Sequence, residues 1–342
     1  MGAIFTNIAE IFANSGWAQI FFAEGGWKYA VMIGVACVLL YLAIVHQFEP
    51  LLLLPIAFGM LLTNIPNAGM YHPELWTGMN AAGEHVGIDY LQVMQEGGLL
   101  DILYMGVKLQ VYPPLIFLGI GCMTDFGPLI ANPKSFLLGA AAQGGIFFTF
   151  ILAGLFFTGK EASSIAIIGG ADGPTAIYVS SKLLSGGGAI DTGTIALAAY
   201  TYMALVPIIQ PPIMRALTTK KERSIKMGQL RKVSKTEKII FPIAVTLIIG
   251  SLIPSAAPLV GMLMLGNLFK ESGVVSRLVD TAQNAMMNII TIFLGISVGA
   301  TTKADKVINK EFLLVMLLGV AAFSLGTASG VLLGKLMNKL SG

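Results

Sequence analysis

Apolar residues in this chain come in long runs that are separated by short polar stretches. Only helices and closed barrels satisfy all of their backbone groups in lipid, and these runs are too continuous for the alternating strands of a barrel. The pattern therefore predicts an all-α polytopic membrane protein with about nine to ten membrane segments. The candidate segments are 29–46, 49–65, 99–121, 135–158, 161–184, 191–217, 236–253, 255–269, 278–299 and 311–338.

The composition agrees with a membrane location. Hydrophobic residues make up 55% and charged residues 11% of the 342 positions, and the mean hydropathy is +0.79. A soluble domain carries roughly 25% charged residues, so this chain has too few charges to cover a water-facing surface. We expect a single membrane domain over residues 1–342.

The loops between the apolar runs differ in charge. Basic residues dominate 215–235, where only Glu222 opposes them, and the positive-inside rule predicts that this loop is cytoplasmic. The stretch 66–98 carries acidic residues without lysine or arginine, which indicates an external loop. The basic residues of the first loop are Arg215, Lys220, Lys221, Arg223, Lys226, Arg231, Lys232 and Lys235, and the acidic residues of the second are Glu74, Glu84, Asp89 and Glu96.

The segment 161–184 differs from the other candidates because the polar sequence GGADGP occupies its middle, at 169–174. Glycine permits a helix to unwind, and proline cannot extend a helix through its own position. Counting crossings from an external 66–98 to a cytoplasmic 215–235 also requires that this segment makes no net crossing. We therefore expect a re-entrant hairpin of two half-helices that enters from outside.

An internal repeat is visible at an offset of 176 residues. The sequence IFLGI occurs at 116–120 and again at 292–296, and FLL occurs at 136–138 and again at 312–314. An odd number of crossings between the copies makes the second copy inverted, as in many secondary transporters. Chance similarity between apolar segments is the alternative interpretation.

The repeat and the hairpin together predict how the membrane domain is divided. The expected parts are a first repeat at about 30–160, the re-entrant hairpin at 161–184, a linking span at 191–217, the basic loop at 215–235 and a second repeat at about 236–340. In folds of this kind the functional site lies where broken helices meet near the midplane.

Asp172 is the sharpest candidate for chemistry. A carboxylate inside the membrane is costly and usually marks an ion or proton path. Unwinding around Asp172 frees backbone carbonyls such as that of Gly170, which together with Thr175 can form an all-oxygen cage for sodium. An ordinary external turn with a solvated aspartate is the alternative.

Polar residues on a late span form a second candidate group. Asn288 and Thr291 lie on one helical face, and Ser297 follows further along the same span. Such side chains coordinate a cation or hydrogen-bond another helix, and the two roles are about equally favoured.

The segment 191–217 contains Tyr200 and Tyr202 and ends in a Gln-Pro-Pro run at 210–212, which we expect to break the helix. A tyrosine there donates to a cation-bound water or to a substrate, or simply packs. Asp101 and Lys108 are expected to find structural partners across the bundle.

Several motifs are missing from the sequence. There is no phosphate-binding GxxxxGK[ST] loop, no haem-attachment CxxCH and no clustered His or Cys ligands. The chain also lacks a biotin-attachment sequence of the Ala-Met-Lys-Met type. We expect no nucleic-acid partner.

The sequence GGADGPTAIY at 169–178 resembles the beta subunit of the sodium-pumping biotin-dependent decarboxylases, a family that acts on oxaloacetate, methylmalonyl-CoA or glutaconyl-CoA. The likeness extends through YMALVPIIQPP at 202–212 and through the stretch 288–299. It covers nearly the whole chain from about residue 30.

The resemblance implies a mechanism and a set of partners. A carboxyltransferase (alpha) subunit would move CO₂ from an acid onto biotin held by a biotin carrier, and this chain would decarboxylate the carboxybiotin, consume a proton and export sodium. The chain would lie in the bacterial cytoplasmic (inner) membrane beside a small membrane (gamma/delta) subunit, and a homo-oligomer is a further candidate. Sodium and the carrier-bound carboxybiotin would be its ligands.

The resemblance also assigns roles to individual residues. The essential membrane aspartate of the family falls on Asp172. The asparagine and serine of its late span correspond to Asn288 and Ser297, and its functional tyrosine is Tyr200 or Tyr202, with Tyr202 favoured.

Two other functions are compatible with the same segments. A sodium-coupled carboxylate symporter without chemistry would share the inverted repeat, the broken helix and the cation ligands. A purely structural membrane anchor for a soluble enzyme would not need the polar break at Asp172.

Overall fold

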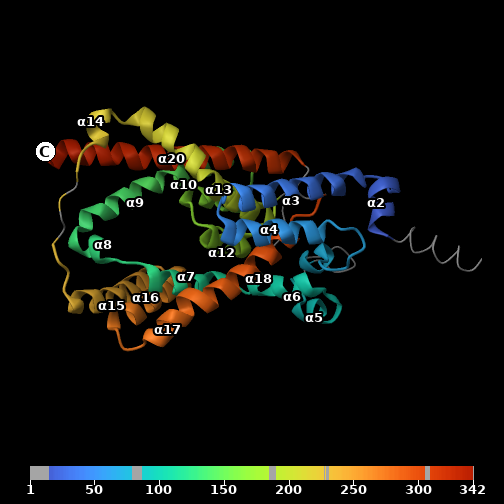
Figure 1. Cartoon of the computed structure of the whole chain (residues 1–342), viewed down its shortest axis with the longest axis horizontal. Helices are drawn as coiled ribbons and strands as arrows, with labels where there is room; N and C mark the ends of the chain where they lie inside the picture. Colours follow the sequence, from blue (N-terminus) through green and yellow to red (C-terminus); the bar gives the residue numbers. More distant parts are fainter. Residues whose placement is uncertain are drawn as a thin grey trace, which may run out of the picture.

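The computed structural model describes residues 15–78, 87–184, 190–226, 228, 231–304 and 309–341, and this part of the chain contains helices and no strands. Figure 1 shows an elongated bundle in which most of the long helices follow the long axis. The helices of the first half are α2 Gly16–Phe22, α3 Trp27–Val45, α4 Pro50–Thr63, η1 Pro73–Trp76, α5 Tyr90–Glu96, α6 Leu99–Lys108, α7 Tyr112–Met123, α8 Gly127–Ala131, η2 Pro133–Ser135, α9 Phe136–Ala142, α10 Gly144–Ala153, α11 Gly159–Ala166, η3 Ile167–Gly170 and α12 Gly173–Leu183.

The second half begins with the longest of the bent helices. Its elements are α13 Thr192–Leu217, α14 Lys220–Arg223, α15 Lys235–Leu252, η4 Pro254–Ala256, α16 Ala257–Ser272, α17 Ser276–Thr281, the π-helical turn η5 Ala282–Met286, α18 Met287–Ala300 and α20 Lys310–Ser341. Each of the predicted apolar segments therefore contains at least one helix. Residues 79–86, which include Glu84 of the expected external loop, lie outside the described residues.

The predicted count of nine to ten membrane segments is not confirmed. In the described residues four helical stretches are long and apolar enough to cross a membrane, or up to six if each of two bent pairs counts as one span. Helix α4 has 14 residues and α16 has 16, fewer than the roughly 20 that span the hydrocarbon layer. The four stretches are Trp27–Val45, Pro133–Ala153, Ser276–Ala300 and Lys310–Leu340.

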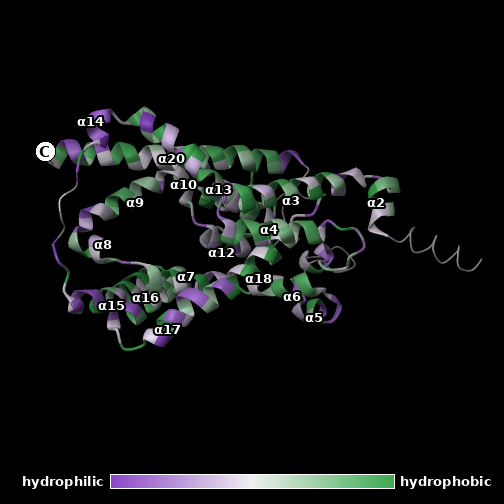
Figure 2. Ribbon diagram, in the orientation of Figure 1, coloured by the Kyte–Doolittle hydropathy of each residue, from purple (hydrophilic) through white to green (hydrophobic). Residues whose placement is uncertain are grey.

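Charged segments gather at the two ends of the bundle. Helix α14, the start of α15 and the end of α20 lie at one end, and α5 lies at the opposite end (Figure 1). Figure 2 shows hydrophilic residues in each of these parts, whereas the middle of the long helices is mainly hydrophobic. The basic loop and the acidic stretch thus lie at opposite ends of the long axis.

At the α15 end a lysine links three segments. The Lys238 ammonium lies 3.3 Å from the Asp125 carboxylate and 3.5 Å from the carboxylate of Glu271 on α16. The Gly127 N–H and Lys238 both donate to Asp125 and hold the pKa of that carboxyl below its ordinary value. These contacts tie α15 to α16 and to the start of α8.

Two helix crossings mix the first and second halves of the chain. Helix α4 packs along α18, and α7 packs along α16. A Cβ added to Gly299 would overlap the carbonyl of Ile56, and one added to Gly266 would overlap the carbonyl of Leu118. Both crossings therefore depend on glycine to bring two backbones together, as is common between membrane helices.

Two buried asparagines hold the ends of these crossings in related ways. The Asn64 amide donates to the carbonyl of Thr302 at 2.9 Å, just past the end of α18. The Asn267 amide donates to the carbonyl of Thr124 at 3.1 Å, just past the end of α7. In each crossing an asparagine of one helix pairs a carbonyl at the end of its partner, where a helix leaves such groups unsatisfied.

The segment 161–184 forms two short helices with a break between them. Helix α11 and the turn η3 end at Gly170, Ala171 takes a left-handed conformation with φ of 56°, and α12 begins at Gly173. Helix α11 is 8 residues long and α12 is 11, so each covers about 12–17 Å of a layer that is about 30 Å thick. Neither half-helix spans a membrane alone.

Helix α13 bends earlier than the sequence indicated. The Gln-Pro-Pro run at 210–212 lies inside the helix, and the prediction that it breaks the helix is wrong. The axis instead turns by 59° between Met203 and Leu205. Pro207 explains this position, because a proline removes the hydrogen bond to the carbonyl four residues earlier, here Met203, and clashes with it.

Candidate functional site

The break in the hairpin is enclosed by α10, α13 and α20. Gly169 packs on Gly145 of α10, whose backbone lies 3.1 Å from a Cβ built on Gly169, and on Ala322 of α20 at the same distance. A Cβ on Gly145 would in turn meet the backbone of Gly326 at 2.8 Å. Small residues on three elements therefore let the unwound backbone lie deep in the bundle.

Asp172 is the N-cap residue of α12 and is partly buried. Its carboxylate accepts a hydrogen bond from the Thr175 hydroxyl, which brings two of the predicted sodium ligands together. The Gly170 carbonyl lies one turn before Pro174, and because proline has no N–H, a continuing helix cannot pair this carbonyl. Carboxylate, hydroxyl and carbonyl oxygens are the ligands that hard cations prefer.

Tyr200 of α13 lies against the start of α12. A Cβ added to Gly173 would overlap the Tyr200 ring and come within 2.8 Å of its hydroxyl oxygen, so only glycine fits beside this ring. Tyr200 is 1% exposed, and its hydroxyl has no hydrogen-bond partner among the described residues. A buried hydroxyl without a partner is costly, which marks the space next to Asp172 as a place where a ligand can complete the hydrogen bonding.

Tyr202 has a different environment. Its side chain is equally buried, but its hydroxyl donates to the Met316 carbonyl of α20, and its ring packs beside Phe323. Residues two apart on a helix point in different directions, so the two tyrosines of α13 face different neighbours. The preference for Tyr202 over Tyr200 therefore finds no support in the contacts of the two hydroxyl groups.

Asn288 and Ser297 lie on α18, whereas Asp172 caps α12. Ser297 is fully buried in α18, and its hydroxyl donates to the Phe293 carbonyl at 2.6 Å. Asn288 is exposed near the start of the same helix. Within the described residues, no hydrogen bond joins either side chain to Asp172.

The Asp101 carboxylate, by contrast, accepts several hydrogen bonds from the protein. This residue is 0% exposed, and its carboxylate accepts from the Trp76 indole at 2.7 Å, from the Gly98 N–H at 2.9 Å and from the His72 backbone at 3.1 Å. The His72 ring lies 2.8 Å from the same carboxylate. The expected structural role of Asp101 fits these contacts, and Lys108 lies over the Tyr104 ring at 5.7 Å.

The described residues contain no group of three His, Cys, Asp or Glu side chains that could hold a metal ion. A cation beside Asp172 would therefore be held by one carboxylate and neutral oxygens. Asn64, a polar residue at the end of an apolar run, forms buried hydrogen bonds that its position in the sequence does not predict.

The helical bundle, the charge separation and the broken hairpin define a membrane protein with a polar site around Asp172. A family model described as the Na⁺-transporting oxaloacetate decarboxylase beta subunit matches residues 28–342. The chain belongs to this family of decarboxylase beta subunits.

Similar proteins are named as beta subunits of decarboxylases with different substrates. The methylmalonyl-CoA decarboxylase subunit beta of Propionigenium modestum is 61% identical over 316 residues, which cover 91% of this chain and 78% of that protein. The glutaconyl-CoA decarboxylase subunit beta of Acidaminococcus fermentans is 49% identical, with 100% and 83% covered. The oxaloacetate decarboxylase beta chain of Klebsiella pneumoniae is 50% identical, with 92% and 81% covered.

Proposed function

We propose that this chain decarboxylates carboxybiotin carried by a partner subunit and couples the reaction to sodium export. Membership of the family supports the overall reaction. The observation that carries the proposal is Asp172, a carboxylate at a helix break that accepts from the Thr175 hydroxyl, beside a Tyr200 hydroxyl that has no hydrogen-bond partner in the described part of the chain. A cation and a proton are the two ligands that compete for such a carboxylate.

The membrane arrangement we propose is an inverted repeat with a re-entrant hairpin at 161–184. The two copies of IFLGI lie in α7 and α18, and each of these helices packs along a helix of the other half of the chain, α7 on α16 and α18 on α4, with a buried asparagine at each crossing. Adding α4, α15 and α16 to the six possible spans gives nine membrane segments, and counting the hairpin as well gives ten. The cysteine-scanning accessibility of 161–184 from the two sides of the membrane tests this arrangement.

The sodium ligands in this proposal are the Asp172 carboxylate, the Thr175 hydroxyl and the Gly170 carbonyl. Asn288 and Ser297 are nine residues apart on one helix, which separates them by about 13 Å along its axis. They cannot both coordinate a single ion, whose protein ligands lie within a few ångströms of it. We place them at two depths of the path that leads to or from Asp172.

The proposed coupling is an exchange of ligands on Asp172. Decarboxylation breaks the N–C bond of carboxybiotin, takes up one proton at the biotin nitrogen and releases CO₂. Sodium binds the ionised carboxylate, and protonation of Asp172 weakens that binding and releases the ion. Exporting one charge against 100 mV costs about 2.3 kcal/mol, which the decarboxylation must supply.

The partners in this proposal are a carboxyltransferase (alpha) subunit, a biotin carrier and a small membrane (gamma/delta) subunit, with a homo-oligomer as a further arrangement. The bundle would lie in the bacterial cytoplasmic membrane, with the basic loop 215–235 in the cytoplasm and 66–98 outside. The basic end is then the side from which the carrier delivers carboxybiotin. The symporter alternative needs neither the carrier nor the carboxyltransferase.

The test replaces Asp172 by Asn in the reconstituted complex. We expect that Asp172→Asn abolishes both sodium transport and sodium-stimulated decarboxylation of carboxybiotin, because a neutral amide cannot exchange a proton for a cation. The matched control is Asp89→Asn at the exposed N-cap of α5, where Asn caps equally well and activity should be unchanged. Full coupled activity in the Asp172→Asn complex contradicts the proposal, and sodium-driven carboxylate uptake by the chain alone favours the symporter.

A further inference from the structure

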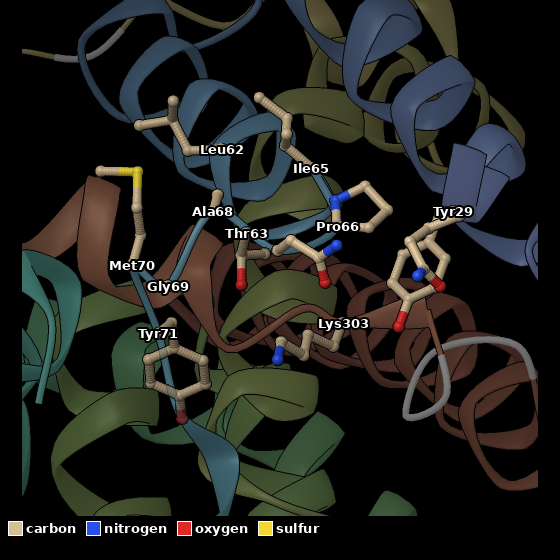
Figure 3. Close-up of a pocket in the computed structure, with 12 residues that line it drawn as sticks. Tyr29, Leu62, Thr63, Ile65, Pro66, Ala68, Gly69, Met70, Tyr71 and Lys303 are labelled. Carbon is tan, nitrogen blue, oxygen red and sulfur yellow. The ribbon is translucent and has the colours of Figure 1, made fainter. Parts of the chain in front are cut away.

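A polar cavity of about 230 Å³ lies at the end of the bundle where α4 and α18 finish, away from Asp172. Its walls are the end of α4, the segment 65–71, Lys303 just past α18, and residues of α2 and α3 (Figure 3). Lys303 is the one charged side chain among these lining residues. The Tyr29 ring closes one side of the cavity.

Two side chains in the cavity wall have unused hydrogen-bonding capacity. Thr63 is 6% exposed, and its hydroxyl has no hydrogen-bond partner among the described residues. Lys303 is partly buried and forms no ion pair with the described residues. Figure 3 shows the Thr63 hydroxyl and the Lys303 ammonium directed into the same space. A buried unpaired hydroxyl beside a lysine in a cavity indicates that a ligand completes the site.

Asn64 holds Lys303 in this position. The Asn64 amide donates to the Thr302 carbonyl at 2.9 Å, and its oxygen accepts the Ala304 N–H at 3.1 Å, so it bonds the backbone on both sides of Lys303. A further bond to the Met60 carbonyl at 2.8 Å anchors the amide to α4. Asn64 is 0% exposed. This clamp keeps the lysine and the adjacent Thr63 on opposite sides of one cavity.

We infer that this cavity is a binding site for a small carboxylate-type anion. An ammonium group offers three donors and no acceptor, and the hydroxyls of Thr63 and Tyr29 add donors, so the site matches a carboxylate oxygen pair. Sodium does not fit, because Lys303 repels a cation and the lining residues include no carboxylate to offset it. The volume accommodates a bicarbonate or a short organic acid.

The test measures anion-dependent thermal stability of the full chain purified in detergent. Potassium acetate and potassium bicarbonate are titrated at constant ionic strength, balanced with potassium chloride. A ligand at ten times its Kd raises the folded-to-unfolded ratio about 11-fold, so the unfolding midpoint should rise with acetate or bicarbonate. A larger rise with bicarbonate identifies bicarbonate as the preferred ligand, and a larger rise with acetate identifies an organic acid.

Variants assign the effect to the cavity. Lys303→Met should weaken anion binding by at least about tenfold and Lys303→Arg should retain it, since hydrogen bonds to a charged group contribute about 1.5–3 kcal/mol. Thr63→Val should leave the ligand-free protein equally or more stable while weakening the anion effect, because it removes a hydroxyl that is unsatisfied without ligand. The charge control is Lys310→Met at an exposed position of α20.

Each result decides the inference. An equal rise in wild type and Lys303→Met, or an equal rise in chloride alone, shows a general salt effect and overturns it. Loss of the rise in Lys310→Met also overturns it, because that lysine lies outside the cavity. None of these outcomes depends on decarboxylase activity. The anion-binding inference is therefore tested independently of the proposed function.

Discussion

Asp101 and Asp172 both lie inside this bundle, and their surroundings differ in a way that separates a scaffold residue from a candidate site residue. Asp101 is completely buried and accepts hydrogen bonds from His72, Trp76 and Gly98. Asp172 sits at a helix break with the Thr175 hydroxyl as its side-chain partner. Burying a charge is unfavourable unless hydrogen bonds or ions compensate it. Asp101 has that compensation in the protein, whereas the proposed function assigns the remaining compensation of Asp172 to sodium or a proton.

The same contrast holds for the neighbouring aromatic residues. Trp76 donates to Asp101 and packs edge to face against Tyr104 at 4.8 Å, so its polar group is satisfied. Tyr200 is buried more completely than Trp76, but its hydroxyl has no hydrogen-bond partner among the residues that the structure describes. A buried polar group without a partner destabilises the empty site and favours the bound one. Residual hydrogen-bonding capacity, rather than burial, thus distinguishes the candidate sodium site.

The largest effect expected from this comparison is on stability at Asp101. Asp101→Asn places an amide donor opposite the Gly98 N–H and the His72 ring, and replaces charge-assisted bonds by neutral ones. We expect a loss of about 3 kcal/mol in the free energy of unfolding. Thermal unfolding in detergent measures it, with Asp172→Asn as the comparison, which should lose no stability because it removes a poorly compensated charge.

An equal loss of stability in Asp101→Asn and Asp172→Asn contradicts this comparison. Greater destabilisation by Asp172→Asn than by Asp101→Asn means that the hairpin carboxylate is part of the scaffold. A stable Asp101→Asn protein that has lost sodium transport means that Asp101, and not only Asp172, acts on the ion.

Much of this architecture is predictable from the sequence. The polar interruption GGADGP predicted the break that separates α11 from α12, because glycine and proline act through local backbone chemistry. The apolar runs predicted where helices occur, because a backbone in lipid must satisfy its own hydrogen bonds. The number of membrane segments is harder to predict from the sequence. Short helices such as α4 and α16 are identified as part of the bundle only by the helices that they pack against.

The parts that the sequence did not reveal depend on contacts between distant residues. His72 and Trp76 lie in a loop more than 20 residues before Asp101, and no local pattern predicts that they meet it. Tyr200 and Tyr202 look equivalent in the sequence, and only the neighbours of α13 distinguish them. The bend of α13 appeared at Met203 because the effect of Pro207 is transmitted one turn back.

A smaller effect is expected where the hairpin meets α13. Gly173→Ala places a methyl group into the Tyr200 ring, so the ring or the start of α12 must move. We expect a destabilisation of about 1–3 kcal/mol and a loss of sodium-stimulated decarboxylation, measured by thermal unfolding and by turnover. Gly139→Ala is the matched control, because its Cβ meets nothing within 4 Å, and alanine there should be neutral or slightly stabilising.

An active and stable Gly173→Ala protein contradicts the close approach of Tyr200 to the break. Loss of stability with unchanged sodium dependence assigns Gly173 to packing alone. Both variants change one glycine in a helix, so any difference between them reports the surroundings rather than helix propensity.

The smallest effects are expected from removing a single hydroxyl from each tyrosine of α13. Tyr202→Phe loses the bond to the Met316 carbonyl and should cost about 1 kcal/mol of stability with little change in sodium dependence. Tyr200→Phe removes an unpartnered hydroxyl, so stability should be unchanged or higher, whereas the sodium concentration for half-maximal decarboxylation should rise several-fold. Thermal unfolding and sodium titration of the two variants, side by side, measure both quantities. The reverse result, a sodium defect confined to Tyr202→Phe, would show that spare hydrogen-bonding capacity does not identify the ion site and would move that site toward α20.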